Sequence, residues 1–350
     1  MDKRQIKILF LNADTGDYLN IGLLNGLRSL EGVEVVDFPK SNVSYKTEQP
    51  FLQSKIRGKG FTLFFTLDDK PINRFHLKYN DIINDAFDLI VFGDIQSSFG
   101  LYLELLPYLK RDKVCFLDGS DAPNLFGDAG FWWRKWYYWT IPKPQNRFLY
   151  FKREWLPEEV NFSRFYKILP RFLCKLLPQP KNLRTISFSI PLSKIVNFLP
   201  QKTKLFTRHI VDEAVAKNVE GSATSYAFDS EEAYYQDIQA SKFGITTKRS
   251  GWDCLRHYEI AANGTVMCFK DLDKKPIECA PHGLIDGINC INYQHYADLM
   301  EKIEKIDDAA YTQLVNASIE WAKDYSSKKV ALRFLKHFAF NSQVLSSKII

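Results

Sequence analysis

An arginine, a glutamate and an asparagine are spaced so that one helix would place them on a single face. Arg256, Glu259 and Asn263 stand at positions i, i+3 and i+7 of the run GWDCLRHYEIAAN. Near a helix start, arginine neutralises a diphosphate and glutamate accepts hydrogen bonds from ribose hydroxyls. The alternative is an ordinary surface pair between Arg256 and Glu259, which stabilises a helix by only about 0.2–0.5 kcal/mol.

Local signals place this helix between residues 251 and 263. Ser250 with Asp253 fits a capping box, and Gly264 suits the end of a helix. The strand-like run KFGITT precedes it and ends in further hydrogen-bond donors. These donors are Thr246, Thr247, Lys248 and Arg249. We therefore expect a strand, a donor-rich turn and a helix that together address one ligand.

Strand-like and helix-like segments alternate along the whole chain, which predicts an α/β fold with two doubly wound sheets. Strands are expected at 5–12, 32–38, 87–94, 113–121, 204–211, 242–247 and 265–269. Helices are expected at 19–30, 101–110, 229–241 and 251–263. A proline-bounded stretch at 190–204 separates the halves. The predicted units are residues 1–195, residues 196–330 and a C-terminal helix at 331–350 that packs across both.

Composition excludes several classes of protein. The 350 residues carry 47 basic and 41 acidic side chains, a net charge of +6 that favours phosphate-bearing ligands without requiring nucleic acid. The first strand is not followed by G-x-G-x-x-G, which argues against a dinucleotide site, and G-x-S-x-G is absent. The six cysteines form no C-x-x-C pair, so we expect reduced thiols and no zinc site. We interpret Asp271-Leu-Asp273 as a loop, so no metal is expected.

The run GWDCLRHYEIAANGTV, followed by FKDLDKKP, resembles the donor-binding region of exostosin-like glycosyltransferases of the GT-B fold. The stretches YFKRE (150–154), SFSIP (187–191) and LFTRHIVD (205–212) also resemble bacterial members. This resemblance implies two Rossmann-like domains that face each other across a cleft, with the acceptor in the first, a nucleotide-sugar donor in the second, and no other cofactor. It implies that Glu259 binds the ribose, that Arg256 and Arg208 meet the diphosphate, and that Gly251 leaves room for it. The full predicted donor-binding set is Arg208, Thr247, Lys248, Arg249, Gly251, Trp252, Arg256 and Glu259.

One departure from this family bears on mechanism. Many retaining GT-B enzymes carry a second glutamate eight residues before the ribose glutamate, and Gly251 stands there in this chain. Inversion is therefore favoured, and it requires a base in the first half. The candidates are Asp14, Asp118 and Asp121, each of which could equally be a turn or helix cap. The missing glutamate also leaves an alternative open, a catalytically silent nucleotide-sugar-binding protein.

Two aromatic and basic segments suggest where an acceptor comes from. Residues 162–181 place an apolar stripe opposite basic side chains, with Pro170 expected to kink or split the helix, and FWWRKWYYW occupies 131–139. Such segments suit a lipid-linked glycan acceptor at an anionic membrane. They also fit helices packed on the core, or another acceptor such as nucleic acid. The N-terminus lacks a cleavage-like segment, so we expect a cytoplasmic protein that is peripheral at the inner face of the membrane.

Overall fold

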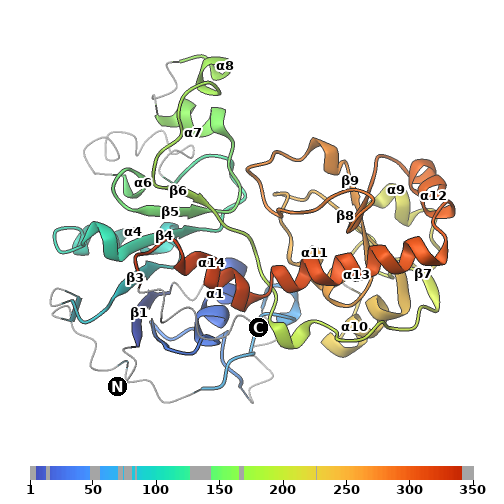
Figure 1. Ribbon diagram of the computed structural model, residues 1–350, viewed down its shortest axis with the longest axis horizontal. Coiled ribbons are helices and arrows are strands. Elements are labelled where there is room, and N and C mark those ends of the chain that lie inside the picture. The colour runs from blue at the N-terminus through green and yellow to red at the C-terminus, as the bar shows by residue number, and fades with distance from the viewer. Residues whose placement is uncertain are drawn as a thin grey trace.

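The protein contains two parallel sheets, which lie in two lobes (Figure 1). The computed structural model describes residues 5–12, 16–47, 56–69, 74, 81–82, 85–126, 143–164, 169–225 and 227–340. The first sheet has six strands in the order β2-β1-β3-β4-β5-β6, and the second has four in the order β10-β9-β8-β7. This arrangement confirms the predicted α/β fold with two wound sheets.

The inner strands of the first sheet are almost wholly buried, whereas its two edge strands are partly exposed. Its strands are β1 (Ile6–Leu11), β2 (Val33–Phe38), β3 (Leu89–Phe92), β4 (Val114–Asp118), β5 (Leu149–Lys152) and β6 (Leu183–Thr185). Its helices are α1 (Tyr18–Arg28), α4 (Ile95–Leu105), α6 (Pro144–Arg147), α7 (Pro157–Arg164) and α8 (Arg171–Cys174). The predicted helix 101–110 is misplaced, because Asp94 caps α4 six positions earlier than expected (101 − 95 = 6) and Pro107 follows its end.

The second sheet follows the predicted rhythm with shorter elements. Its strands are β7 (Lys204–Phe206), β8 (Ser241–Thr247), β9 (Val266–Lys270) and β10 (Cys290–Tyr293). Its helices are α9 (Glu213–Ala216), α10 (Glu231–Ala240), α11 (Leu255–Ala262), α12 (Tyr296–Glu304) and α13 (Asp308–Asp324). Short 3₁₀ turns are η1 (Arg57–Gly60), η2 (Arg111–Lys113), η4 (Leu192–Lys194) and η5 (Leu272–Lys274).

The start of α11 differs from the prediction, whereas its end agrees. The helix begins after Cys254, whose backbone N–H donates to His257 Nδ1 at 3.3 Å. The expected cap partner, Asp253, instead accepts from Phe188 N at 2.9 Å and from the Tyr258 hydroxyl at 2.9 Å. Gly264 has φ +68° just beyond the helix, as a C-terminal glycine should.

The C-terminal helices connect the lobes. Helix α13 packs on α11, and the last helix, α14 (Ser327–Leu335), packs on α1 (Figure 1). This contact is close, because a Cβ on Gly26 would lie 2.0 Å from the carbonyl oxygen of Ser327. Phe151 and Phe334 from the first lobe share one buried cluster with Tyr258 from the second. The division into units at residues 195 and 330 stays a prediction.

Two predicted features fall wholly or partly outside the described residues. The aromatic run 131–139 lies outside them entirely. The expected amphipathic helix 162–181 is divided, since α7 ends at Arg164 and α8 starts directly after Pro170. In the described part of the chain, no helix is both long enough and apolar enough to cross a bilayer.

Candidate functional site

The carboxylate of Glu259 is enclosed between the two lobes. Glu259 is 2% exposed, its Oε2 accepts a hydrogen bond from the Tyr234 hydroxyl at 2.7 Å, and its Oε1 accepts a short one from the Thr62 hydroxyl. Burial raises the pKa of Glu259, while the two hydroxyl donors and the charge of Arg256 act in the opposite direction. The carboxylate therefore accepts hydrogen bonds from hydroxyl groups, and in this conformation both donors are hydroxyls of the protein.

The loop of residues 56–66 brings Thr62 to this carboxylate from the first lobe. The Thr62 backbone N–H donates to Glu231 Oε1 at 2.6 Å, and its hydroxyl lies 2.8 Å from that of Tyr235. Lys59 of the same loop pairs with Asp229 at 2.9 Å. Thr62 has φ +67°, a left-handed conformation that is costly for a branched residue. No pattern in the sequence indicated this contact, because the loop has neither strand nor helix periodicity.

Cationic side chains gather at the end of β8. Lys248 and Arg249 are exposed, and Arg256 is partly buried. The pKa of the buried His209 imidazole is lowered to about 4, first by burial and then by the charges of Arg256 and Arg249. Arg256 and Arg249 thus lie near His209, whose imidazole is neutral at neutral pH, and the positive potential of the two arginines suits a phosphate.

The remaining predicted donor residues lie around this turn. Lys248 Nζ lies 5.3 Å from the ring centre of Trp252, which stacks in turn on Phe269. The Thr247 hydroxyl lies 3.4 Å from the carbonyl oxygen of Lys248. Arg208 is exposed, and its backbone N–H donates to Asp237 at 2.9 Å. Lys248 and Trp252 therefore contact each other directly after β8, whereas Arg208 is bonded to α10 through Asp237.

Gly251 packs against acidic side chains of the first lobe. A Cβ at this position would lie 2.3 Å from Glu154 Oε1 and 2.8 Å from Asp121 Oδ1. The space beside Gly251 thus holds carboxylates in this conformation, where the sequence predicted room for a diphosphate. A glutamate at position 251 would collide with both groups.

A buried arginine organises the contact between the lobes. Arg153 is 1% exposed and donates to Glu154 at 2.8 Å, to the Asp253 carbonyl at 3.0 Å and to Asp121 through a short ion pair. Its guanidinium also lies 4.3 Å from the ring centre of Phe188. Burial raises the pKa of Asp253 to about 6 despite the nearby positive charge of Arg153. We call Arg153, Glu154, Asp121 and Asp253 the Arg153 network.

The predicted base candidates differ in their surroundings. Asp14 lies outside the described residues. Asp118 is 1% exposed, accepts from the Tyr150 hydroxyl at 2.6 Å and pairs with Lys152 at 3.1 Å. Asp121 is partly exposed and pairs with Arg153. Asp118 is therefore buried and bonded to Tyr150 and Lys152, and Asp121 belongs to the Arg153 network.

Another aspartate at this edge was overlooked. Asp17 caps α1 through Oδ1, which accepts from Asn20 N at 2.9 Å, and its Oδ2 would lie 2.6 Å from a Cβ on Gly119. Burial and, to a smaller extent, the charge of Asp94 raise the pKa of Asp17 to about 6. An aspartate just before an apolar helix is a capping signal that could have identified Asp17.

The Asp271-Leu-Asp273 motif lies on the turn after β9. Asp271 has φ +56° and pairs with Lys274 at 2.8 Å, and Asp273 accepts from Asn292 at 2.8 Å. Across the described part of the chain, His, Cys, Asp and Glu residues form no cluster of three suited to a metal ion. The six cysteines are free thiols.

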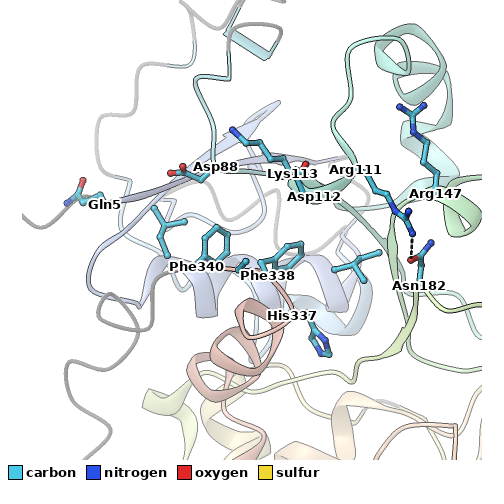
Figure 2. Close-up of a pocket in the computed structure, with 13 residues that line it drawn as sticks. Gln5, Asp88, Arg111, Asp112, Lys113, Arg147, Asn182, His337, Phe338 and Phe340 are labelled. Atoms are coloured by element: carbon cyan, nitrogen blue, oxygen red, sulfur yellow. Dashed lines mark hydrogen bonds between the residues drawn. The ribbon is translucent and has the colours of Figure 1, made fainter.

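One cavity lies far from the predicted residues. It measures about 760 Å³ and is lined by residues that precede β3, β4 and β5, together with the segment after α14 (Figure 2). Its lining includes Arg111, Lys113 and Arg147 together with His337 and Phe338. These strand ends are amino-terminal, so this cavity is at the opposite edge of the first sheet from Arg153.

A second cavity borders the loop over Glu259. It measures about 820 Å³ and is lined by Lys59 and Phe61 of the loop, by Lys194, and by Glu231 at the start of α10. Both lobes contribute to it. Phe61 stacks on Tyr234, whose hydroxyl binds Glu259, so this cavity is separated from the carboxylate by the loop and its contacts.

Comparison with solved structures identifies the fold. A glycosyltransferase from Rickettsia africae ESF-5 superposes with a TM-score of 0.51 at 10% identity, covering 99% of this chain and 100% of the other. The fold is GT-B. HepE from Anabaena, in complex with UDP and glucose, has a TM-score of 0.49 at 9% identity over 95% of this chain and 99% of its own. Sucrose-phosphate synthase from Thermosynechococcus elongatus has a TM-score of 0.46 at 11% identity over 95% and 98%.

Comparisons by sequence give no family. No protein-family model matches this GT-B chain, and no curated protein matches it either. The resemblance to exostosin-like enzymes therefore still depends on the motif residues alone. The expected GT-B architecture is confirmed, whereas the roles of the individual side chains stay predictions.

Proposed function

We propose that this GT-B protein is a glycosyltransferase that moves a sugar from a nucleotide-sugar donor to a hydroxyl of a glycan acceptor. The observation that supports this most is the Glu259 carboxylate, which binds two hydroxyl groups close to a cationic strand end. Exostosin-like enzymes remain the family that its motifs resemble. The reaction is inverting and independent of a metal ion, and the acceptor is a lipid-linked glycan at the cytoplasmic face of a membrane.

The donor binds where Thr62 now lies. A ribose hydroxyl takes the place of the Thr62 hydroxyl on Glu259, and the diphosphate meets Arg256, Arg249 and Lys248 at the end of β8. Donor binding therefore requires the loop of residues 56–66 to move away. Because Phe61 and Lys59 line the 820 Å³ cavity, outward movement of this loop would join that cavity to the carboxylate.

Asp17 is the base in this proposal. Inversion needs a group that removes the acceptor proton while the diphosphate leaves from the opposite face of the sugar. With its pKa raised to about 6, Asp17 is mostly ionised at neutral pH, yet it is a stronger base than an ordinary aspartate. Asp118 and Asp121 are weaker candidates, because their carboxylates already bind Lys152 and Arg153. Cationic side chains at the β8 end offset the leaving-group charge.

A silent nucleotide-sugar-binding protein is the second candidate. Carboxylates fill the space beside Gly251, and Glu259 is covered, so the enclosed arrangement also fits a protein that binds a ligand without transferring it. Under this alternative the loop movement would report ligand binding, and no sugar would be consumed.

A ligand panel with a turnover assay separates these functions. UDP, GDP, CMP and their sugars are added to the protein, and the thermal midpoint of unfolding is measured. A true donor at 100 times its dissociation constant should add about 2.7 kcal/mol to the free energy of unfolding. Stabilisation together with consumption of the sugar nucleotide supports the transferase. Stabilisation with no turnover on any acceptor favours the silent protein, and no stabilisation by any nucleotide contradicts both.

A further inference from the structure

Helix α8 and the turn after it expose three large apolar side chains. Phe172 is 70% exposed, Leu173 40% and Leu176 79%. Figure 1 shows α7 and α8 standing out from the first lobe, beyond β5 and β6. We call residues 169–177 the α8 tip. Large apolar groups that cluster on a projection are typical of a surface that meets another apolar phase.

Buried contacts at the base hold the α8 tip in this conformation. The Asn161 side chain of α7 is fully buried, and its amide donates to the carbonyl oxygens of Cys174 at 3.0 Å and Leu177 at 3.1 Å. Cys174 is itself buried, so it anchors the inner side of the turn. Both amide hydrogens of Asn161 are thus used to fix the backbone, which leaves Phe172 and Leu176 directed outward.

The charged side chains of the α8 tip itself are basic, and a glutamate of α7 pairs with one of them. Residues 169–181 contain Arg171, Lys175 and Lys181 and no acidic residue. The Arg171 side chain is 63% exposed, although it pairs with Glu159 at 3.1 Å, and Lys175 is exposed beside Leu176. Basic side chains next to exposed apolar ones match the headgroups and acyl region of an anionic bilayer.

We infer that the α8 tip docks on a bilayer that contains anionic phospholipid. Phe172, Leu173 and Leu176 enter the headgroup and acyl boundary, while Lys175 and Arg171 stay at the lipid phosphates. Helix α7 begins at Pro157, shortly after β5 ends at Lys152, so the tip arises from the same sheet edge as Arg153. A membrane bound there would lie on the side of the first lobe where GT-B proteins are expected to take ligands.

Vesicle flotation tests this inference with the full-length protein. Vesicles of phosphatidylcholine with phosphatidylglycerol are compared with vesicles of phosphatidylcholine alone. The wild-type protein should float with the anionic vesicles, and the double variant F172S/L176S should lose at least about tenfold in partition coefficient. Lys175→Gln should lose about fivefold on anionic vesicles and change little on neutral ones.

Matched controls make the outcome decisive. F198S/L199S removes two apolar side chains of similar exposure, 58% and 52%, from the linker and should float like the wild type. Equal thermal midpoints for all variants confirm that each is folded. Wild-type protein that stays soluble, or F172S/L176S that floats unchanged, would overturn the inference, as would equal flotation on neutral vesicles. The lipid-linked acceptor belongs to the proposed function, whereas flotation requires no transfer, so the two can fail separately.

Discussion

Two of the polar contacts between the lobes satisfy a buried ionisable group in different ways. In the Arg153 network, a buried cation meets the carboxylates of Glu154 and Asp121 and a backbone carbonyl. At Glu259, the carboxylate meets the neutral hydroxyls of Thr62 and Tyr234. Both contacts bury an ionisable group, but only the first gives it fully charged partners.

This difference indicates that the Arg153 network stays formed and that the hydroxyl partner of Glu259 can be exchanged. An ion pair that is desolvated on both sides is costly to break, since each charge would be left without its partner. A carboxylate bound by hydroxyls can exchange one hydroxyl for another of similar strength, such as that of a sugar. The Arg153 network should therefore hold the lobes together while the Thr62 contact opens.

Removing Arg153 should give the largest effect. Arg153→Met leaves the buried Glu154 carboxylate and the partly exposed Asp121 carboxylate without their cation, so the free energy of unfolding should fall by about 3–5 kcal/mol. Urea unfolding measures this. Lys329→Met, which removes one side of the exposed Lys329–Asp324 pair, should cost less than about 1 kcal/mol. Similar losses of stability for both variants would show that the Arg153 network does not hold the lobes together more strongly than a surface ion pair.

Replacing Asp17 should affect rate and stability in opposite directions. Because Asp17 is the proposed base, Asp17→Asn should slow transfer by about 100-fold or more. Its pKa in the folded protein, about 6, exceeds the ordinary value of 3.8. Ionisation of Asp17 therefore begins to destabilise the fold as the pH rises above 3.8, and the full destabilisation is present above about 6. The variant should therefore be more stable than the wild type by about 1–2 kcal/mol near pH 7, and this gain should disappear near pH 4.

Measurements at several pH values check both parts of this prediction. In the wild type, kcat/KM should fall as the pH drops below about 6, and this limb should be absent from Asp17→Asn. Asp307→Asn changes a capping aspartate of α13, which accepts from Ala310 N at 2.8 Å, and should leave the rate unchanged. A wild-type rate in Asp17→Asn would remove Asp17 from the reaction.

Removing the Thr62 hydroxyl should give a smaller effect that distinguishes the two contacts. Thr62→Val deletes the bond to Glu259, so the unliganded protein should lose about 1 kcal/mol of stability. Nucleotide affinity should rise a few-fold, because the competing hydroxyl is gone. Thr66→Val, in the same loop but bonded to Asn25 and the Leu63 carbonyl, should not increase affinity. Weaker nucleotide binding by Thr62→Val would contradict exchange at Glu259.

The sequence was sufficient for elements whose signals are local. Apolar runs identified β1, β3 and β4, because parallel strands buried on both faces have no polar side. Gly264 correctly marked the end of α11, since glycine readily adopts the positive φ required there. The predicted start of α11 was wrong, because the Asp253 side chain accepts hydrogen bonds from Phe188 N and the Tyr258 hydroxyl and therefore does not cap the helix.

The site was only partly predictable, because its key contacts are distant in the chain. The hydrogen bond from Thr62 to Glu259 joins residues 197 positions apart, and the loop that carries Thr62 has no periodicity. Spacing also could not separate Asp17 from Asp118, because both lie at the carboxyl edge of one sheet. Their difference depends on Lys152, which reaches Asp118 from a neighbouring strand.

A binding cycle tests whether Glu259 exchanges the Thr62 hydroxyl for a ribose hydroxyl. Calorimetry measures the affinity of UDP and of 2′,3′-dideoxy-UDP, or the same pair with the base selected by the ligand panel, for the wild type and Glu259→Gln. The wild type should lose at least about tenfold in affinity for the dideoxy compound, a charge-assisted bond contributing about 1.5–3 kcal/mol, and the variant should lose much less. Equal losses in both proteins would contradict the account.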